Sequence, residues 1–190
     1  MNRPMDAAAM TALVQSARAG DREAFGEIYR QFSGRVFGLC KKLLGAAAPA
    51  EDATSDVFMR TQQALDRYDP ARPFDRWLLS IASNHCLNLL RRRSLERRLF
   101  AANADTEPST AATESPLGAL SSAEQRQQVR DAVSELPDKL RLPLVLRYDA
   151  ELSYDEIAAA LGINRDHVAT LLVRAKQALR RSLAARPEAT

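Results

Sequence analysis

The sequence contains little of what a catalytic site is usually built from. Only two histidines and two cysteines occur among 190 residues, and their spacing matches neither a zinc site nor a cysteine–histidine nucleophile. Seven glycines leave little material for a glycine-rich phosphate-binding loop, and no such motif occurs. An enzyme, such as a nucleic-acid hydrolase, is therefore the least favoured class, and we expect neither a cofactor nor a metal.

Long hydrophobic runs are missing as well. No stretch of about 18 uncharged apolar residues exists, and the N-terminal residues MNRPMDAAAMTALVQ lack the continuous apolar core of a secretory signal. We therefore expect a cytoplasmic protein. In that reducing compartment Cys40 and Cys86, each within an apolar helical pattern, should be buried small hydrophobic residues, and a disulfide is the less favoured alternative.

Positive charge is concentrated in the first half of the chain. Residues 1–100 contain 16 basic and 11 acidic residues, whereas residues 121–190 contain 11 basic and 10 acidic residues. Within residues 91–98, RRRSLERR, five of the eight positions are arginine. This density favours a polyanionic partner, and a solvated helix end, where cations complement the helix dipole, is the alternative.

One segment has the composition of a linker. Residues 101–120, AANADTEPSTAATESPLGAL, contain two prolines, three acidic residues and no aromatic or β-branched aliphatic residue. So little apolar surface cannot offset the entropy lost when a backbone becomes ordered. The pattern predicts a domain over residues 1–100, a flexible linker over 101–120 and a second domain over 121–190.

Both predicted domains have helical periodicity, because apolar residues recur at spacings of three and four and no alternating run bounded by turn signals is present. Asp21 is the predicted N-cap and Gly45 the predicted end of a long helix. A second helix should begin near Pro49 and bury one side. The inward-facing positions of the first helix are predicted to be Phe25, Ile28, Tyr29, Phe32, Val36, Phe37, Cys40, Leu43 and Leu44, and those of the second Val57, Phe58, Thr61 and Leu65.

Residues 74–93, FDRWLLSIASNHCLNLLRRR, combine a strongly apolar helix with two asparagines. Asn84 and Asn88 are one turn apart, about 6 Å along the helix axis, so they share an open edge. Trp77 is expected in the core. The pattern predicts a buried helix whose polar edge and basic end contact a partner.

Residues 153–183 predict a helix-turn-helix. Ser153 with Glu156 three residues later begins a short helix, Gly162 makes the turn, and Asn164 caps a second helix. A helical hairpin without a nucleic-acid function is the alternative. Opposite the apolar stripe of the second helix lie Asp166 and the candidate DNA-contacting residues Thr170, Val173, Arg174 and Gln177, with Arg165 and His167 at its start.

The order of these parts resembles a group IV, extracytoplasmic-function (ECF) type sigma factor of bacterial RNA polymerase. Residues from LVQSARAGDREAFGEIYRQF through AEDATSDVFMRTQQALDRYDPARPF to WLLSIASNHCLNLLRRR are similar to the σ2 domain, and ELPDKLRLPLVLRYDAELSYDEIAAALGINRDHV is similar to σ4. The resemblance implies an all-α fold of two small helical domains, a σ2-like bundle and a σ4-like helix-turn-helix.

The resemblance also implies partners and contact residues. The helix with the AED motif would dock on the clamp helices of the polymerase β′ subunit through Glu51, Asp52, Asp56 and Gln62. The minus-ten promoter element would be read as a separated single strand by Arg67, Tyr68, Asp69, Arg72, Asn84 and Asn88, with duplex phosphates contacting Arg91, Arg92 and Arg93. In the second domain Arg147 and Tyr154 would join the helix-turn-helix residues at the minus-thirty-five element, whose opposite side would meet the β flap.

One departure from the family pattern concerns the start of the recognition helix. Asp166, His167, Val168, Ala169, Thr170 and Leu171 occupy a span where relatives commonly carry Gly-Thr-Val-Lys/Arg-Ser-Arg, so two customary cations are missing. Fewer phosphate contacts weaken salt-dependent affinity. We expect Arg165, Thr170 and Arg174 to carry much of the upstream contact, and a factor that opens only promoters matching well at both elements.

The preferred function is thus a dissociable sigma factor that directs core RNA polymerase to specific promoters and assists their opening. By resemblance, an anti-sigma factor is expected to hold it inactive, and any membrane contact would come only through a membrane-bound anti-sigma factor. The alternative is a free-standing helix-turn-helix regulator with a helical effector or dimerisation domain. The acidic first turn of the AED helix and the arginine run favour the sigma factor, because a repressor needs neither.

Overall fold

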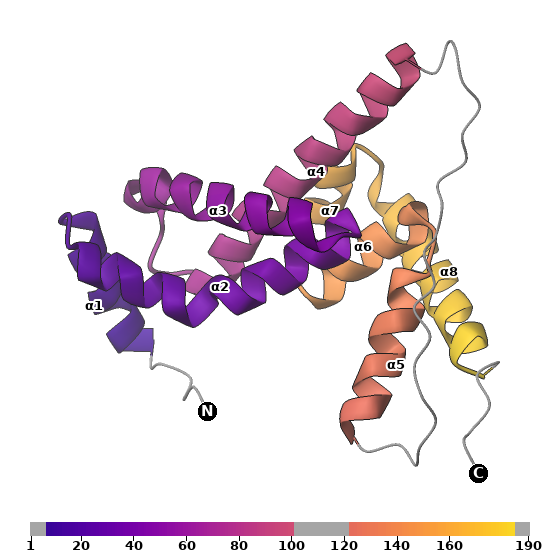
Figure 1. The fold of residues 1–190 in the computed structure, drawn as a ribbon, viewed down its shortest axis with the longest axis horizontal. Coiled ribbons are helices and arrows are strands. Elements are labelled where there is room, and N and C mark those ends of the chain that lie inside the picture. Colours follow the sequence, from indigo (N-terminus) through magenta and orange to yellow (C-terminus); the bar gives the residue numbers. More distant parts are fainter. Residues whose placement is uncertain (1–6, 101–121, 185–190) are drawn as a thin grey trace. The chain divides into compact units, whose positions relative to one another are not determined.

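The computed structural model describes residues 7–100 and 122–184, and every regular element within them is helical (Figure 1). The predicted linker, residues 101–120, lies wholly outside the described residues. The all-α prediction is confirmed. In chain order the elements are α1 Ala7–Arg18, α2 Arg22–Leu44, α3 Ala47–Ala64, the 3₁₀ turn η1 Leu65–Arg67, α4 Phe74–Phe100, α5 Ser122–Ser134, α6 Asp138–Tyr148, α7 Tyr154–Leu161 and α8 Arg165–Ala184.

The described residues form two compact units. The first contains the residues up to Leu90 together with Val145–Ser153, and the second contains the residues from Arg91 to Leu144 and from Tyr154 onward. This division by contact differs from the one predicted from the sequence at residues 91–100 and 145–153. The functional boundaries at 100 and 121 stay a prediction.

Helix α2 is the longest element of the first unit whose two ends are both set by local sequence. The carboxylate of Asp21 accepts hydrogen bonds from the backbone N–H groups of Glu23 and Ala24, as predicted for an N-cap. At the other end Gly45 adopts a φ of 81°, and its N–H donates to the carbonyl of Lys41. Only glycine adopts this left-handed conformation readily, which is why the helix stops there.

The core of the first unit lies between α2, α3 and α4. Ile28, Val36 and Leu43 of α2 are fully buried, as are Val57 of α3 and Leu78 of α4. Figure 1 draws α2 and α3 side by side, and these two helices pack along much of their length. The predicted inward side of the second helix is confirmed, because Val57, Phe58, Thr61 and Leu65 are all buried.

The two cysteines meet in this core. Cys40 of α2 and Cys86 of α4 are both free and have no exposed surface. Their side chains are hydrogen-bonded to one another, and this bond together with burial raises the pKa of the Cys86 thiol. The prediction of buried, unpaired cysteines is confirmed, and they pack as small apolar groups between two helices.

Two expectations about aromatic residues need correction. Tyr29 was expected to face inward, but its side chain is 45% exposed and its ring lies over Phe58 at a centroid distance of 4.7 Å. Trp77 is half-buried and not fully within the core. Its ring packs against Tyr68 and Phe74 at centroid distances of 5.2 and 5.6 Å. Helical periodicity assigns a side to each residue, but it does not say which sides a neighbouring helix covers.

The second unit has a smaller core. Leu136, Leu144 and Ala175 are buried together, with Val133, Leu140, Ala178 and Leu179 packed partly buried against them. Helix α8 packs on α5 and α7. Its buried residues are Val168, Leu172 and Ala175, three positions on one face, while Leu171, Leu179 and Leu183 on the same apolar side are only half-buried. More of the surface of α8 is therefore exposed to solvent than the apolar pattern of its sequence predicts.

Candidate nucleic-acid and polymerase interfaces

The loop between η1 and α4 is fixed by its own hydrogen bonds. The carboxylate of Asp69 accepts from the N–H of Ala71 at 2.9 Å, and its carbonyl accepts from the N–H of Arg72 at 3.0 Å. The Tyr68 hydroxyl donates to the carbonyl of Arg72 at 2.7 Å. These bonds stabilise the loop, and the side chains of Arg67, Asp69 and Arg72 are exposed.

Tyr68 does not lie where its predicted role requires. The side chain is 5% exposed, and its ring packs against Phe74 at a centroid distance of 5.2 Å. Burial raises the pKa of its hydroxyl, with Asp69 and Asp75 acting in the same direction. The prediction that Tyr68 contacts DNA is therefore corrected. The side chain is buried and hydrogen-bonded to the backbone of the loop, so it stabilises the loop instead of facing a partner.

Helix α4 presents a narrow polar edge above a buried body. Asn84 and Asn88 are both exposed, whereas His85, Cys86 and Leu87 between them are buried. The open edge predicted for the two asparagines is confirmed. Because residues turn by about 100° along a helix, Arg91 lies on the same side, one turn beyond Asn88. Within residues 78–88 of this helix, few side chains can therefore reach a partner.

The arginine run continues this edge at the end of α4. Arg91, Arg92 and Arg93 are all exposed within the helix. Arg97 and Arg98 belong to the same run, but their side chains lie outside the described residues. Three consecutive arginines project in directions about 100° apart, so they place cationic groups over about 200° of the helix circumference and suit a phosphate backbone.

The acidic helix α3 carries the predicted polymerase-docking residues. Glu51, Asp52 and Gln62 are exposed, and Asp56 is half-buried. At about 100° per residue they fall within one arc of the helix surface, opposite the buried stripe. This arc also contains Met59, whose side chain is 57% exposed. The sequence carried a signal for Met59 that we missed, since it is an apolar residue off the buried stripe of its helix.

One member of this acidic set is tied to the core. The Nε2 atom of His85 on α4 lies 3.3 Å from Oδ2 of Asp56, and the imidazole is 8% exposed. Nε2 forms no well-aligned hydrogen bond with a described residue. The pKa of His85 is lowered, mainly because burial disfavours the imidazolium, with Arg60 acting in the same direction and Asp56 opposing it. The His85 side chain is therefore a neutral imidazole that lies against the carboxylate of Asp56.

The helix-turn-helix of the second unit is built as the sequence predicts. Helix α7 begins at Tyr154, directly after Ser153, and Gly162 makes the turn with a φ of 69°. The side chain of Asn164 then accepts a hydrogen bond from the N–H of His167 at 2.7 Å, which caps α8. Ile157 of α7 and Val168 of α8 are fully buried.

Most predicted contact residues of α8 are exposed on its outer side. His167, Thr170, Arg174 and Gln177 are exposed, and Val173 is 55% exposed. Arg165 is also exposed, with its Nε atom 3.8 Å from Asp155 of α7. The Thr170 hydroxyl donates to the carbonyl of Asp166 at 3.0 Å. Hydroxyl, amide, guanidinium and methyl groups on one helix side form a set that can read base edges.

The two residues predicted from resemblance alone are less open. Arg147 is half-buried, and its guanidinium donates to the carbonyl of Leu152 at 2.9 Å, which closes the turn after α6. Tyr154 is half-buried at the first position of α7. Part of each side chain remains accessible, so both stay candidates for DNA contact.

Comparison with known proteins places the chain in a family. The model of Sigma-70 region 2 matches residues 28–96, and that of Sigma-70, region 4, matches residues 126–179. The ECF RNA polymerase sigma factor SigW of Bacillus subtilis (strain 168) is 32% identical over 176 residues, which cover 90% of this chain and 94% of that protein. The chain belongs to the ECF type of the sigma-70 family. The preferred interpretation of the sequence is thus confirmed over a free-standing regulator.

Solved structures agree with the fold of this sigma factor. The structure of CnrH in complex with the cytosolic domain of CnrY has a TM-score of 0.58 and 25% identity, and covers 96% of this chain and 100% of CnrH. The sigma factor RpoE from Bartonella quintana, in complex with the anti-sigma factor NepR, has a TM-score of 0.61 and 20% identity, and covers 86% of this chain and 98% of RpoE. The latter likeness concerns the fold.

Proposed function

We propose that this sigma factor uses three separate surfaces to direct core RNA polymerase to promoters and to assist their opening. The exposed arc of α3, with Glu51, Asp52 and Gln62, docks on a basic partner, which the resemblance identifies as the β′ clamp helices. The edge of α4 and the loop before it bind the minus-ten element. The outer side of α8 binds the minus-thirty-five element.

The observation that carries this proposal is the exposed polar edge of α4. Asn84 and Asn88 each offer one amide, with donors and an acceptor that can pair with an unpaired base. The preceding loop exposes Arg67 and Arg72, and the exposed arginines of residues 91–93 follow Asn88 along the helix. Cations on both sides of two amides form a basic track that can hold a separated strand by its phosphates while bases are read.

These exposed amide and guanidinium groups are suited to binding a nucleic acid and not to catalysing a reaction. Among residues 7–100 and 122–184 no group of three or more His, Cys, Asp or Glu side chains could hold a metal ion. We propose a dissociable specificity subunit that leaves RNA synthesis to the core polymerase. None of the described helices is long and apolar enough to span a membrane, and the proposed site of action is the cytoplasm, where chromosomal promoters are found.

A protein inhibitor is part of the proposal. CnrH and RpoE were each solved with a partner, the cytosolic domain of CnrY and the anti-sigma factor NepR respectively. Since CnrH aligns over 96% of this chain, we propose that an anti-sigma factor also binds this sigma factor and competes with the polymerase or with DNA. Any membrane contact would then come through that partner. Affinity purification of the native protein is the direct search for it.

Run-off transcription tests the proposed function. Purified chain is added to core polymerase with a library of genomic fragments, and the transcripts are sequenced. We expect initiation from a defined set of promoters by core polymerase plus this chain, and none by core polymerase alone. A chain that alters transcription only when another sigma factor is already bound would contradict the proposal and support a regulator.

A further inference from the structure

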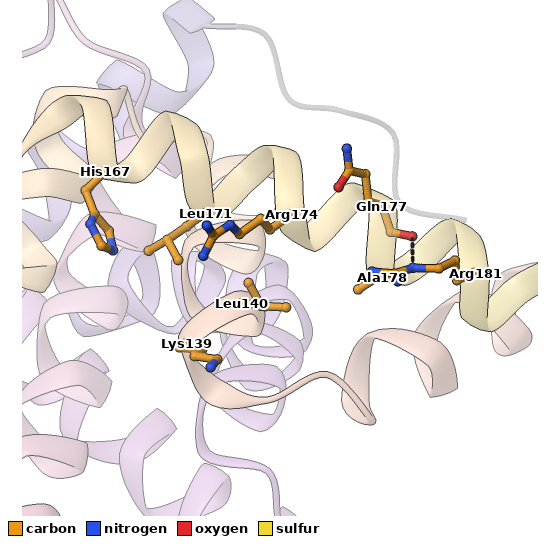
Figure 2. Close-up of a pocket in the computed structure, with 8 residues that line it drawn as sticks. All are labelled: Lys139, Leu140, His167, Leu171, Arg174, Gln177, Ala178 and Arg181. Atoms are coloured by element: carbon orange, nitrogen blue, oxygen red, sulfur yellow. Dashed lines mark hydrogen bonds between the residues drawn. The ribbon is translucent and has the colours of Figure 1, made fainter.

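A groove of about 550 Å³ runs between α6 and α8 within the second unit (Figure 2). Its floor is apolar and its rim is cationic, and no carboxylate of the described residues lines it. The lining residues are Lys139 and Leu140 of α6 and His167, Leu171, Arg174, Gln177, Ala178 and Arg181 of α8. Three of them, His167, Arg174 and Gln177, are also candidate promoter contacts, so the groove and the outer side of α8 are continuous.

Lys139 and Arg181 were not among the residues predicted from the sequence. Both are exposed. Neither forms an ion pair with a carboxylate of the described residues, whereas the neighbouring Arg141 pairs with Asp138 at 2.7 Å. The Nε atom of Arg181 lies 3.4 Å from the carbonyl of Gln177, which holds the guanidinium along the helix. Two cationic groups are thus available at the rim of the groove.

The position of Arg181 along α8 favours a phosphate over a base. At 1.5 Å per residue, Arg181 lies about 10 Å beyond Arg174 along the helix axis. The major groove of DNA is about 12 Å wide. A helix that places Thr170 and Arg174 against base edges would therefore carry Arg181 out to the phosphates that border the groove. Figure 2 shows the same order, with Arg174 in the middle of the lining residues and Arg181 toward the far end of the helix.

Lys139 reaches the groove from a different helix. Lys139 lies on the α6 side of the groove, and Leu171 lies on the α8 side (Figure 2). Leu171 is one turn from His167 and offers no polar group. Its ammonium group can approach a phosphate without entering the major groove. Because the groove is lined by cations and a histidine without a balancing carboxylate, its charge complements a polyanion.

We infer that the groove between α6 and α8 extends the promoter-binding surface, with Lys139 and Arg181 binding phosphates of the DNA backbone beside the minus-thirty-five element. The inference rests on the proposed function, and it assigns these two residues a role in affinity and not in sequence discrimination. An acidic protein segment in the same groove is the competing occupant, and the experiment below separates the two.

The test uses the sigma factor assembled with core polymerase. Binding to a promoter selected in the transcription experiment, and to the same duplex with a scrambled upstream element, is measured by fluorescence anisotropy over a series of potassium chloride concentrations. Each phosphate contact contributes about 0.9 to the slope of log affinity against log salt. Lys139→Gln and Arg181→Gln should each lower that slope by about 0.9, equally on both duplexes, and Lys139→Arg should restore it.

Arg180→Gln is the matched control, because Arg180 is an exposed neighbour of Arg181 that does not line the groove. It should leave the slope unchanged. An equal loss in Arg180→Gln and Arg181→Gln would overturn the inference, since net charge alone would then explain both. Unchanged slopes for Lys139→Gln and Arg181→Gln, with a lower slope for Arg174→Gln, would also overturn it while leaving the proposed function intact.

Two further outcomes are informative. If Lys139→Gln binds DNA normally but binds core polymerase more weakly, the groove holds a protein segment and the inference is wrong. If the unmodified chain fails to direct core polymerase to any promoter, the proposed function itself fails, which the transcription experiment reveals before any groove variant is made. Far-UV circular dichroism of each variant should match the unmodified chain, since the substituted residues are exposed.

Discussion

Helices α4 and α8 are both proposed to bind promoter DNA, yet they are held in their units in different ways. Seven side chains of α4 from Leu78 to Leu87 are buried or nearly so, which leaves Asn84 and Asn88 as a narrow exposed edge. Helix α8 buries only Val168, Leu172 and Ala175. The same element type therefore offers few contact residues in one unit and many in the other.

This difference has a physical consequence for recognition. A helix that is covered on most sides can place one or two side chains with little freedom, and losing one of them removes much of the contact. A helix covered on one face spreads its contacts over hydroxyl, amide and cationic groups, so each carries a smaller share. Substitutions in the two helices should therefore differ in effect, and the largest difference is expected in the core.

Core variants in the two helices should differ in stability. Leu78 of α4 is fully buried, so Leu78→Ala should lower the free energy of unfolding by about 3–5 kcal/mol, through lost burial and the cavity that remains. Leu171→Ala in α8 should cost only about 1 kcal/mol, because Leu171 lines an open groove. Chemical denaturation followed by far-UV circular dichroism measures both, and the fluorescence of Trp77 reports on the first unit. Equal losses would remove the contrast.

Asn84→Ala should then have the largest effect on promoter choice. One amide–base contact contributes about 1–3 kcal/mol of discrimination, so selectivity between the natural and an altered minus-ten element should fall about tenfold. Run-off transcription on the two templates measures it. Ser94→Ala, at an exposed position later in α4, is the control and should keep full selectivity. If Asn84→Ala did so too, the base-reading role of this edge would be lost.

Arg174→Gln should have a smaller effect, because other groups on α8 share the contact. We expect affinity of the holoenzyme for the promoter to fall a few-fold, and the salt slope to fall by about 0.9 if the guanidinium binds a phosphate. Anisotropy titrations at several salt concentrations give both quantities. If Arg174→Gln lowered promoter affinity by a larger factor than Asn84→Ala lowers selectivity, contacts on α8 would not be shared more widely than those on α4.

The two histidines provide the finest test of the contrast, since His85 is buried in α4 and His167 is exposed on α8. Burial lowers the pKa of His85 in the folded chain. The unfolded chain binds a proton at about pH 6.5, so it holds more protons than the folded chain just below that pH. The free energy of unfolding should therefore fall as pH drops below about 6.5, down to the folded pKa of His85.

Denaturation curves between neutral and mildly acidic pH measure this effect. His85→Gln should remove that part of the pH dependence, and His167→Gln should retain it. A chain whose stability stays constant over this window in both variants and in the unmodified protein would show that His85 titrates alike in the folded and unfolded states.

Local sequence was enough to predict the features that depend on neighbours along the chain. Asp21, Gly45, Gly162 and Asn164 set helix ends through contacts within four residues, and all four have the predicted roles. The open edge of Asn84 and Asn88 also follows from helical periodicity. The resemblance to the sigma family depended on the same short motifs, read in their order.

Other features depended on which helices meet. Tyr29 was expected to face inward but is exposed, because no described helix fully covers its side of α2. Tyr68 was expected to contact DNA but is buried beneath the loop that follows it. The contact of His85 with Asp56 joins residues 29 positions apart on α4 and α3. Lys139 of α6, which lines a groove together with residues of α8, belongs to the same group. No spacing within one helix could have indicated these neighbours.

The sequence by itself determined that the chain is helical, where its main helices start and stop, and to which family it belongs, because these properties follow from periodicity, capping and the order of motifs. The tertiary structure decided which polar residues remain accessible, since burial depends on helices that are distant in the chain. It withdrew Tyr68 from the candidate DNA-contacting residues, brought the buried His85 within 3.3 Å of Asp56, and placed Lys139 of α6 in the same groove as Arg174 and Arg181 of α8.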